Sequence, residues 1–115
     1  VSHDSHNIVA VGVTDEDLTR AVNALIRQGG GLAVVNGNDT DVLPLPIAGL
    51  MSAQDGEVVA CDYERLNQKA KAMGSRLDAP FMTLSFMSLL VIPSLKLSDR
   101  GLFDGNRFEF VSLFA

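Results

Sequence analysis

Apolar residues recur with the period of an α-helix in two stretches of the chain. The first stretch begins at Thr14, a capping residue, and ends at the glycines of 29–31. The second begins at the capping pattern of Ser52 and Asp55 and ends at Gly74. Steps of three and four residues place the apolar side chains of each stretch on one helix face, so the pattern predicts two amphipathic helices. Their apolar stripes are Leu18, Ala21, Val22, Leu25 and Ile26 in the first helix, and Val59, Tyr63, Leu66, Ala70 and Met73 in the second.

Apolar segments without the helical period predict β-strands in the first half of the chain. Residues 6–13 are rich in β-forming residues and predict the first strand. Residues 32–35 and 41–45 predict a hairpin around an Asn-Gly turn at 36–39. Prolines in and after the second of these strands confine it to an edge or to irregular geometry.

The second half of the chain is apolar on both faces of any extended conformation. Residues 81–92 favour a strand covered on two sides, with a short helical start at Phe81 as the alternative. Residues 98–101 have turn chemistry, and residues 108–114 predict a last buried strand. The order of the elements predicts an α/β (α+β) fold, a single domain over residues 1–115 with a mixed β-sheet covered by two main amphipathic helices.

The composition indicates a domain with much apolar surface. Hydrophobic residues make up 47% of the 115 residues, and the mean hydropathy of +0.22 is high for a small domain. The longest apolar run, Leu89–Ile92, is far shorter than the roughly 20 residues that cross a membrane. We therefore expect no membrane partner and an apolar face that docks on another domain. The proline-stiffened segment 43–52 fits either a core connection or a loop pressed against such a domain.

Charge and cysteine content narrow the class of protein further. The net charge is −5, and the 9 Lys and Arg residues are scattered singly, so no basic stripe is available for nucleic acid. Cys61 is the single cysteine and no signal peptide is present, which predicts a cytoplasmic protein. Because the chain starts at Val1 and passes directly into a polar motif, we expect a domain cut from a longer polypeptide.

Both histidines lie in one short polar segment, which is the strongest candidate for chemistry. It consists of His3, Asp4, Ser5, His6 and Asn7. If the segment is extended, His3 and Ser5 share one face while Asp4 and His6 share the other. The residues then cannot converge as a Ser-His-Asp triad. The two histidines would lie about 10 Å apart, so they cannot bind one metal ion without outside ligands.

Two interpretations of this polar segment stay open. In the first, its side chains orient a polar heterocycle or support a metal ligand held elsewhere. In the second, His3 and His6 satisfy backbone groups near a strand start, while Asp4 and Ser5 form a local turn bond.

Three other motifs predict structure rather than chemistry. The glycines of 29–31 follow a helix instead of preceding one, so they predict helix termination and not a phosphate loop. Cys61 has no basic neighbour in sequence and is predicted to be a structural or incidental thiol. Asp99 and Arg100 predict a solvated turn with a local ion pair.

Several blocks of the chain together carry a family resemblance. They are His3–Ile8, Gly29–Leu32, Leu43–Ser52, Pro80–Phe86, Leu97–Leu102 and Phe110–Phe114. In this order and at this spacing they resemble the C-terminal domain of bacterial adenine deaminases, over essentially the whole chain. The resemblance implies a parent enzyme of the amidohydrolase superfamily that converts adenine and water to hypoxanthine and ammonia. It also implies a divalent metal, manganese or iron, that activates water in a (β/α) barrel absent from this chain, a homo-oligomer, and an isolated fragment without activity.

For the site, we expect that His3–Asn7 helps to close or orient the active site of the parent enzyme around adenine, with no metal ligand in this chain. The alternative is a structural packing or oligomerisation module, in which the segment only stabilises its first strand. A stand-alone binding domain is disfavoured, because a pocket made by one motif leaves most of a purine exposed.

Overall fold

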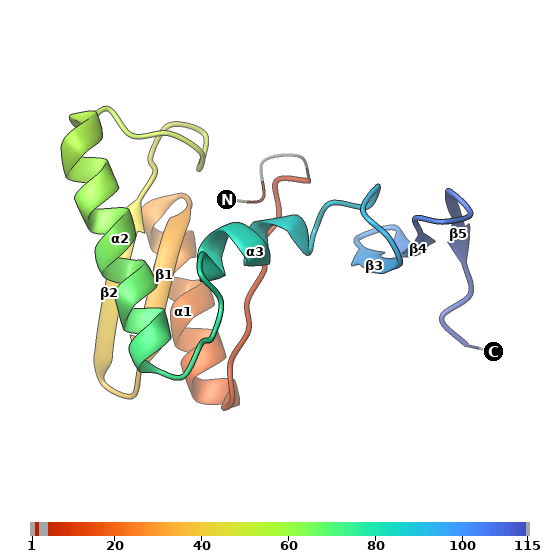
Figure 1. Cartoon of the computed structure of the whole chain (residues 1–115), viewed down its shortest axis with the longest axis horizontal. Helices are drawn as coiled ribbons and strands as arrows, with labels where there is room; N and C mark the ends of the chain where they lie inside the picture. The colour runs from red at the N-terminus through yellow and green to blue at the C-terminus, as the bar shows by residue number, and fades with distance from the viewer. Residues whose placement is uncertain (1, 3–4, 115) are drawn as a thin grey trace.

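A β-hairpin between two helices forms the larger part of the molecule (Figure 1). The hairpin consists of β1 (Gly31–Asn36) and β2 (Asp39–Pro44), and the helices are α1 (Asp15–Gln28) and α2 (Gly56–Ala72). Each helix contacts both strands, and Figure 1 shows α1 behind the hairpin and α2 in front of it. The computed structural model describes residues 2 and 5–114.

The core lies between the hairpin and α2. Leu32 pairs with Leu43 across the hairpin, and both pack in one cluster with Leu66 of α2, which is 0% exposed. Tyr63 and Phe81 are partly buried against this cluster. Since full burial of a leucine side chain contributes about 1.5–3 kcal/mol, these contacts fix α2 and the following helix against the hairpin.

The predicted first helix is confirmed, with both of its ends. The Thr14 hydroxyl accepts a hydrogen bond from the backbone N–H of Asp17 at 3.2 Å. At the other end, Gly29 adopts φ 74° and its N–H reaches the carbonyl of Ile26. The glycines therefore terminate the helix as predicted, because the left-handed cap conformation suits a residue without Cβ.

The predicted second helix is also confirmed, but it begins later than the capping pattern suggested. Asp55 is the capping residue, and its carboxylate accepts from the Glu57 N–H at 2.8 Å. Ser52 accepts instead from the Gln54 N–H in the preceding loop. A capping side chain needs an N–H two or three residues ahead that is free because it starts the helix, and only Asp55 has one.

The predicted fold class is confirmed as a single domain that mixes helices with sheet, but the expectation of one mixed sheet was wrong. The strands form two small antiparallel sheets, β1-β2 and β3-β4-β5, and the described residues contain no parallel pair. A parallel pair needs a strand after a crossover helix. The chain after α2 continues as another helix, so that pair does not form.

Residues 6–13 do not form the predicted first strand. This segment runs past the helices without a strand partner, and Val11 and Val13 are 80% and 102% exposed. A strand requires a neighbouring edge to satisfy its backbone groups, and β-propensity alone does not supply one.

The strand predicted over residues 81–92 was wrong, and its helical alternative is confirmed. Helix α3 (Pro80–Phe86) occupies this place and contacts α2. Pro80 sits in the first turn, where its fixed φ and missing N–H are tolerated. Turns follow α3 up to residue 94.

Residues 95–114 form what we call the C-terminal arm. Its strands are β3 (Leu95–Ser98), β4 (Gly101–Asp104) and β5 (Glu109–Val111), so the predicted turn at 98–101 is confirmed. The predicted buried strand at 108–114 was wrong in length and burial, since Phe114 is 84% exposed.

The C-terminal arm projects away from the helices and hairpin (Figure 1). The radius of gyration of 15.1 Å exceeds the roughly 13 Å expected for a compact domain of similar length. The arm strands make substantial contacts only with one another. Among the described residues, no helix combines the length and apolar character needed to cross a membrane.

Candidate functional site

The polar segment at the start of the chain turns rather than extends at Ser5 and His6. The backbone N–H of His6 donates to the carbonyl of Ser2 at 2.9 Å, and Ser5 lies in a turn. His6 has φ 50°, in the left-handed region that residues with a Cβ seldom occupy. The extended geometry assumed from the sequence is therefore wrong for Ser5 and His6.

Part of the predicted site lies outside the described residues. This holds for His3 and Asp4, so the predicted sharing of faces with Ser5 and His6 stays a prediction. Within the described residues, Ser5, His6 and Asn7 are all exposed.

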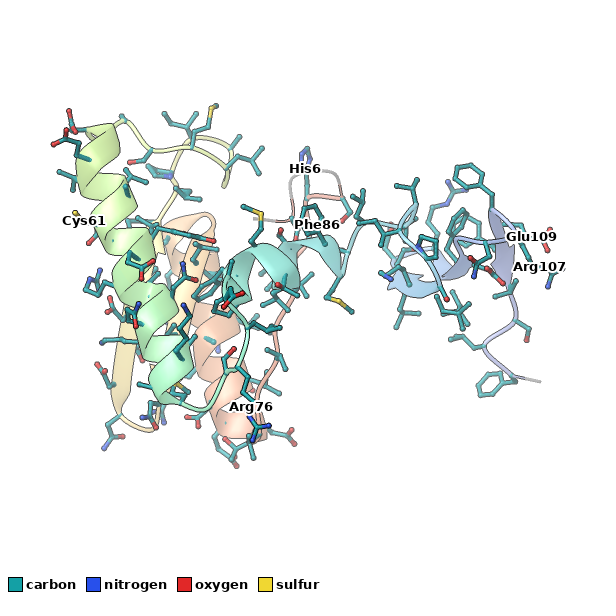
Figure 2. The ribbon with its side chains drawn as sticks, viewed as in Figure 1. His6, Cys61, Arg76, Phe86, Arg107 and Glu109 are labelled. Carbon is teal, nitrogen blue, oxygen red and sulfur yellow. The ribbon has the colours of Figure 1, made fainter. Side chains whose placement is uncertain are left out.

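Ser5 connects the polar segment to the distant end of α3. Its hydroxyl donates to the side-chain oxygen of Asn7 at 3.1 Å and lies 3.4 Å from the carbonyl oxygen of Ser88. Figure 2 shows the His6 ring pointing outward from this loop, near the end of α3 where Phe86 lies. A polar, solvent-facing segment is thus tied to a folded element rather than left free.

An apolar groove lies beside this attachment point. It has a volume of about 530 Å³ and is formed by the hairpin, α2 and α3. Its lining contains Leu43, Tyr63, Phe81 and Phe86 among other apolar residues. Phe86 is two residues before Ser88, so the polar segment meets the chain at the edge of this groove.

The groove and the polar segment differ in chemistry. Among the residues that the structure describes, none that lines the groove is charged, so the groove suits an apolar surface. The segment supplies a hydroxyl, an imidazole and an amide, which together can donate and accept hydrogen bonds. The segment can therefore orient a polar ligand at the edge of the groove. The described side chains do not assemble a triad for nucleophilic catalysis.

A metal ion does not fit the described part of the chain. No group of three or more His, Cys, Asp or Glu side chains comes together there in a way that could hold one. Cys61 lies exposed on α2.

Sequence reasoning identified the polar segment but missed its partner and the groove. Ser88 is separated from Ser5 by 83 positions, and neither residue type carries a signal for that contact. The groove arises where α3 replaces the predicted strand, so only a correct assignment of residues 81–92 would have suggested it.

Comparison with known proteins gives one consistent family. The adenine deaminase C-terminal domain family matches residues 1–109. The chain is 63% identical over 115 residues to an adenine deaminase of Salinibacter ruber, covering 99% of this chain and 21% of that protein. It is 58% identical over 115 residues to an adenine deaminase of Methanosarcina barkeri, covering 100% of this chain and 21% of that protein. For an adenine deaminase of Borreliella burgdorferi the identity is 54% over 112 residues, 96% of this chain and 20% of that protein.

The chain therefore spans about a fifth of the length of the curated relatives that it matches. No solved structure matches the chain significantly.

Proposed function

This chain belongs to the adenine deaminase C-terminal domain family, and from that membership we propose that it is part of an enzyme that hydrolyses adenine to hypoxanthine and ammonia. In this proposal the segment His3–Asn7 helps to close the active site or to orient adenine within it. The catalytic machinery itself belongs to the larger part of the protein, because this chain spans about 21% of its relatives.

The metal belongs to that larger part as well. We propose an amidohydrolase barrel that holds manganese or iron, since the described residues of this chain offer no group of ligands for a metal ion. The proposal includes a cytoplasmic, homo-oligomeric enzyme of purine catabolism, with neither nucleic acid nor membrane as a partner.

The attachment of Ser5 to the end of α3 is the observation that supports this role most directly. A polar loop that only satisfied its own backbone would need no link to an element 83 positions away. His6 is held in a left-handed conformation that costs of order 1–3 kcal/mol, and such conformations cluster at functional sites. The link and the conformation together support a segment that presents side chains in a defined direction.

The chemistry of adenine matches what the segment offers. The purine ring has nitrogen acceptors and an exocyclic amine donor. A neutral imidazole and an amide can each both donate and accept hydrogen bonds. Fixing the ring by such bonds raises the rate by orientation, because the reacting atoms are then held close to their transition-state geometry. In this proposal His6 and Asn7 act on the substrate ring and leave proton transfer and water activation to the rest of the enzyme.

Steady-state deamination of adenine by the full-length enzyme tests the proposal. His3→Ala, His6→Ala and Asn7→Ala are compared with wild type, with Asn106→Ala as a matched asparagine control in an exposed turn of the arm. We expect kcat/KM to fall about a hundredfold for the histidine variants, equivalent to about 2.7 kcal/mol of transition-state stabilisation, and to stay unchanged for Asn106→Ala. Metal content and circular dichroism are measured on each sample.

Unchanged kinetics in all three segment variants would contradict the proposal. The structural packing or oligomerisation module would then be the better account, and it predicts lowered stability or altered assembly with full activity per folded molecule.

A further inference from the structure

The two faces of the C-terminal arm carry different apolar side chains, aliphatic on one face and aromatic on the other. Strand pairing places Leu97 opposite Leu102 and Leu102 opposite Val111, so these side chains share one face. Leu95, two residues from Leu97, points the same way. We call this set of four residues, Leu95, Leu97, Leu102 and Val111, the leucine face.

The opposite face of the arm is aromatic. Phe103 is 8% exposed and packs edge-on against Phe108 and Phe110, with ring centroids 5.4 and 5.2 Å apart. The Arg100 guanidinium lies 5.6 Å from the centre of the Phe110 ring. Phe103 is therefore buried within the arm, while Phe108 and Phe110 remain 67% and 46% exposed.

The leucine face is only partly covered within the described residues. Leu102 and Val111 are half-buried, whereas Leu95 and Leu97 are 52% and 64% exposed. Strands β3, β4 and β5 make substantial contacts only with one another. Three strands of three or four residues need a covered apolar face to be stable, and exposed apolar patches commonly mark interaction surfaces.

The acidic groups on this face are satisfied inside the arm. The Asp104 carboxylate accepts from the backbone N–H groups of Asn106 and Arg107 at 2.8 and 3.2 Å. Glu109 pairs with the Arg107 guanidinium. The Glu109–Arg107 pair stays exposed at the end of β5, so the apolar part of the face is its leucine and valine side chains, which suit an apolar partner surface.

We infer that the leucine face packs against the larger part of the same polypeptide, the part that the relatives contain outside the matched fifth of their length. The match is to a C-terminal domain, so that part precedes residue 1. Ser5 lies against Ser88, and residues 89–94 lead from there into the arm. Covalent attachment gives it a local concentration of order millimolar, which a second copy does not reach in dilute solution.

This inference rests on the proposed function in one respect, that the chain is part of a longer adenine deaminase. It is independent of the role of His3–Asn7. The arm would fasten the domain to the catalytic part and so hold the polar segment in place.

Thiol labelling of the full-length enzyme tests the inference. Leu97→Cys places a thiol on the leucine face, and Asn106→Cys places one in an exposed turn of the same arm as the control. The exposed Cys61 of α2 serves as an internal reference. Modification by a small maleimide is followed site by site by mass spectrometry, with the urea-unfolded enzyme giving the intrinsic reactivity of each thiol.

We expect Cys labelling at position 97 to be at least about tenfold slower than at position 106, because reaction then requires local opening. The ratio of the two labelling rates should not change when the enzyme is diluted about a hundredfold, to a concentration at which light scattering shows a monomer. Equal labelling at both positions would overturn the inference. Protection that disappears on dilution would also overturn it, in favour of a second copy as the occupant.

Failure of this inference and failure of the proposed function are separable. The His6→Ala enzyme should lose deamination while position 97 stays protected. Full activity of His6→Ala with position 97 protected removes only the role of the polar segment, and rapid labelling at 97 with activity lost in His6→Ala removes only the packing of the arm.

Discussion

The hydroxyl of Ser5 lies 3.4 Å from the backbone carbonyl oxygen of Ser88, although the two residues are 83 positions apart. The same hydroxyl donates to Asn7 at 3.1 Å. The hydroxyl has one proton, so it donates to one of these two oxygens at a time, and the shorter contact is the one to Asn7. His6 lies next to this junction in the chain and is itself exposed.

Ser5→Ala should loosen the polar segment without unfolding the domain. Since the hydroxyl donates one hydrogen bond, shared between Asn7 and Ser88, and one such bond contributes about 1 kcal/mol, the free energy of unfolding in urea should fall by no more than that. Hydrogen exchange at the His6 amide, which donates to Ser2 at 2.9 Å, should become several times faster.

Ser98→Ala is the matched control for this prediction. The Ser98 hydroxyl also bonds to a backbone carbonyl, that of Gly101 at 3.1 Å, but it lies in the C-terminal arm. Ser98→Ala should leave the hydrogen exchange of the His6 amide unchanged. If that amide exchanges no faster in Ser5→Ala than in Ser98→Ala, the junction does not hold the polar segment.

The elements that could be predicted from the sequence are those with local signals. Helix α1 has a capping Thr14, an apolar stripe and a terminating Gly29, and all three act within a few residues of each other. The β1-β2 hairpin has an Asn-Gly turn between two apolar runs. Such signals do not depend on the rest of the fold.

The elements that were missed depend on partners far away in sequence. Residues 81–92 are apolar on every face, and a short run of that kind suits a buried strand and a buried helix equally. Pro80 at the first helical position was the one local signal for α3. Residues 6–13 have the composition of a strand, yet they pair with neither strand of the hairpin.

The candidate site, too, could be predicted only in part from the sequence. The concentration of polar residues at Ser5, His6 and Asn7 is visible in the sequence, while its contact with Ser88 and its place beside the groove depend on how α3 packs. Sequence therefore identified which groups were available, and the fold decided where they lie.

Asp41 should contribute more to stability than its neighbour Asp39, and salt should reduce the difference. The Asp41 side chain is 15% exposed and pairs with both Arg65 and Lys69 of α2. Asp41→Asn should lower the free energy of unfolding by about 1 kcal/mol, at the upper end for partly exposed ion pairs. The loss should shrink between 0.1 and 1 M NaCl, because the screening length falls from about 10 to 3 Å.

Asp39→Asn provides the comparison for the ion cluster. Asp39 is 67% exposed and pairs with Lys69 alone, at 3.0 Å, so its replacement should cost less than about 0.5 kcal/mol at either salt concentration. Equal losses for the two variants, or a loss for Asp41→Asn that is independent of salt, would show that the cluster acts through packing rather than charge.

The three glycines after α1 should respond very differently to alanine. A Cβ at Gly31 would lie 2.2 Å from the carbonyl oxygen of Leu43, with φ at 135°. Both the backbone conformation and the paired strand would have to move, at a cost of roughly 1–3 kcal/mol each, so Gly31→Ala should lose about 4 kcal/mol or fail to fold. Gly29 has φ 74° and nothing within 4 Å of an added Cβ, so Gly29→Ala should lose only about 1–2 kcal/mol.

Urea denaturation of the two variants, followed by circular dichroism, separates these costs. Gly29 at φ 74° lies near the left-handed helical region, whereas Gly31 at φ 135° lies far outside it. The difference between the variants therefore measures the less tolerated backbone conformation of Gly31 together with the close approach of β1 to Leu43. Gly30→Ala should resemble Gly31→Ala, since its Cβ would lie 2.5 Å from the Cα of Gly49. Equal stability of the Gly29 and Gly31 variants would mean that the hairpin yields without loss. The close approach of the start of β1 to the end of β2 would then not exist in solution.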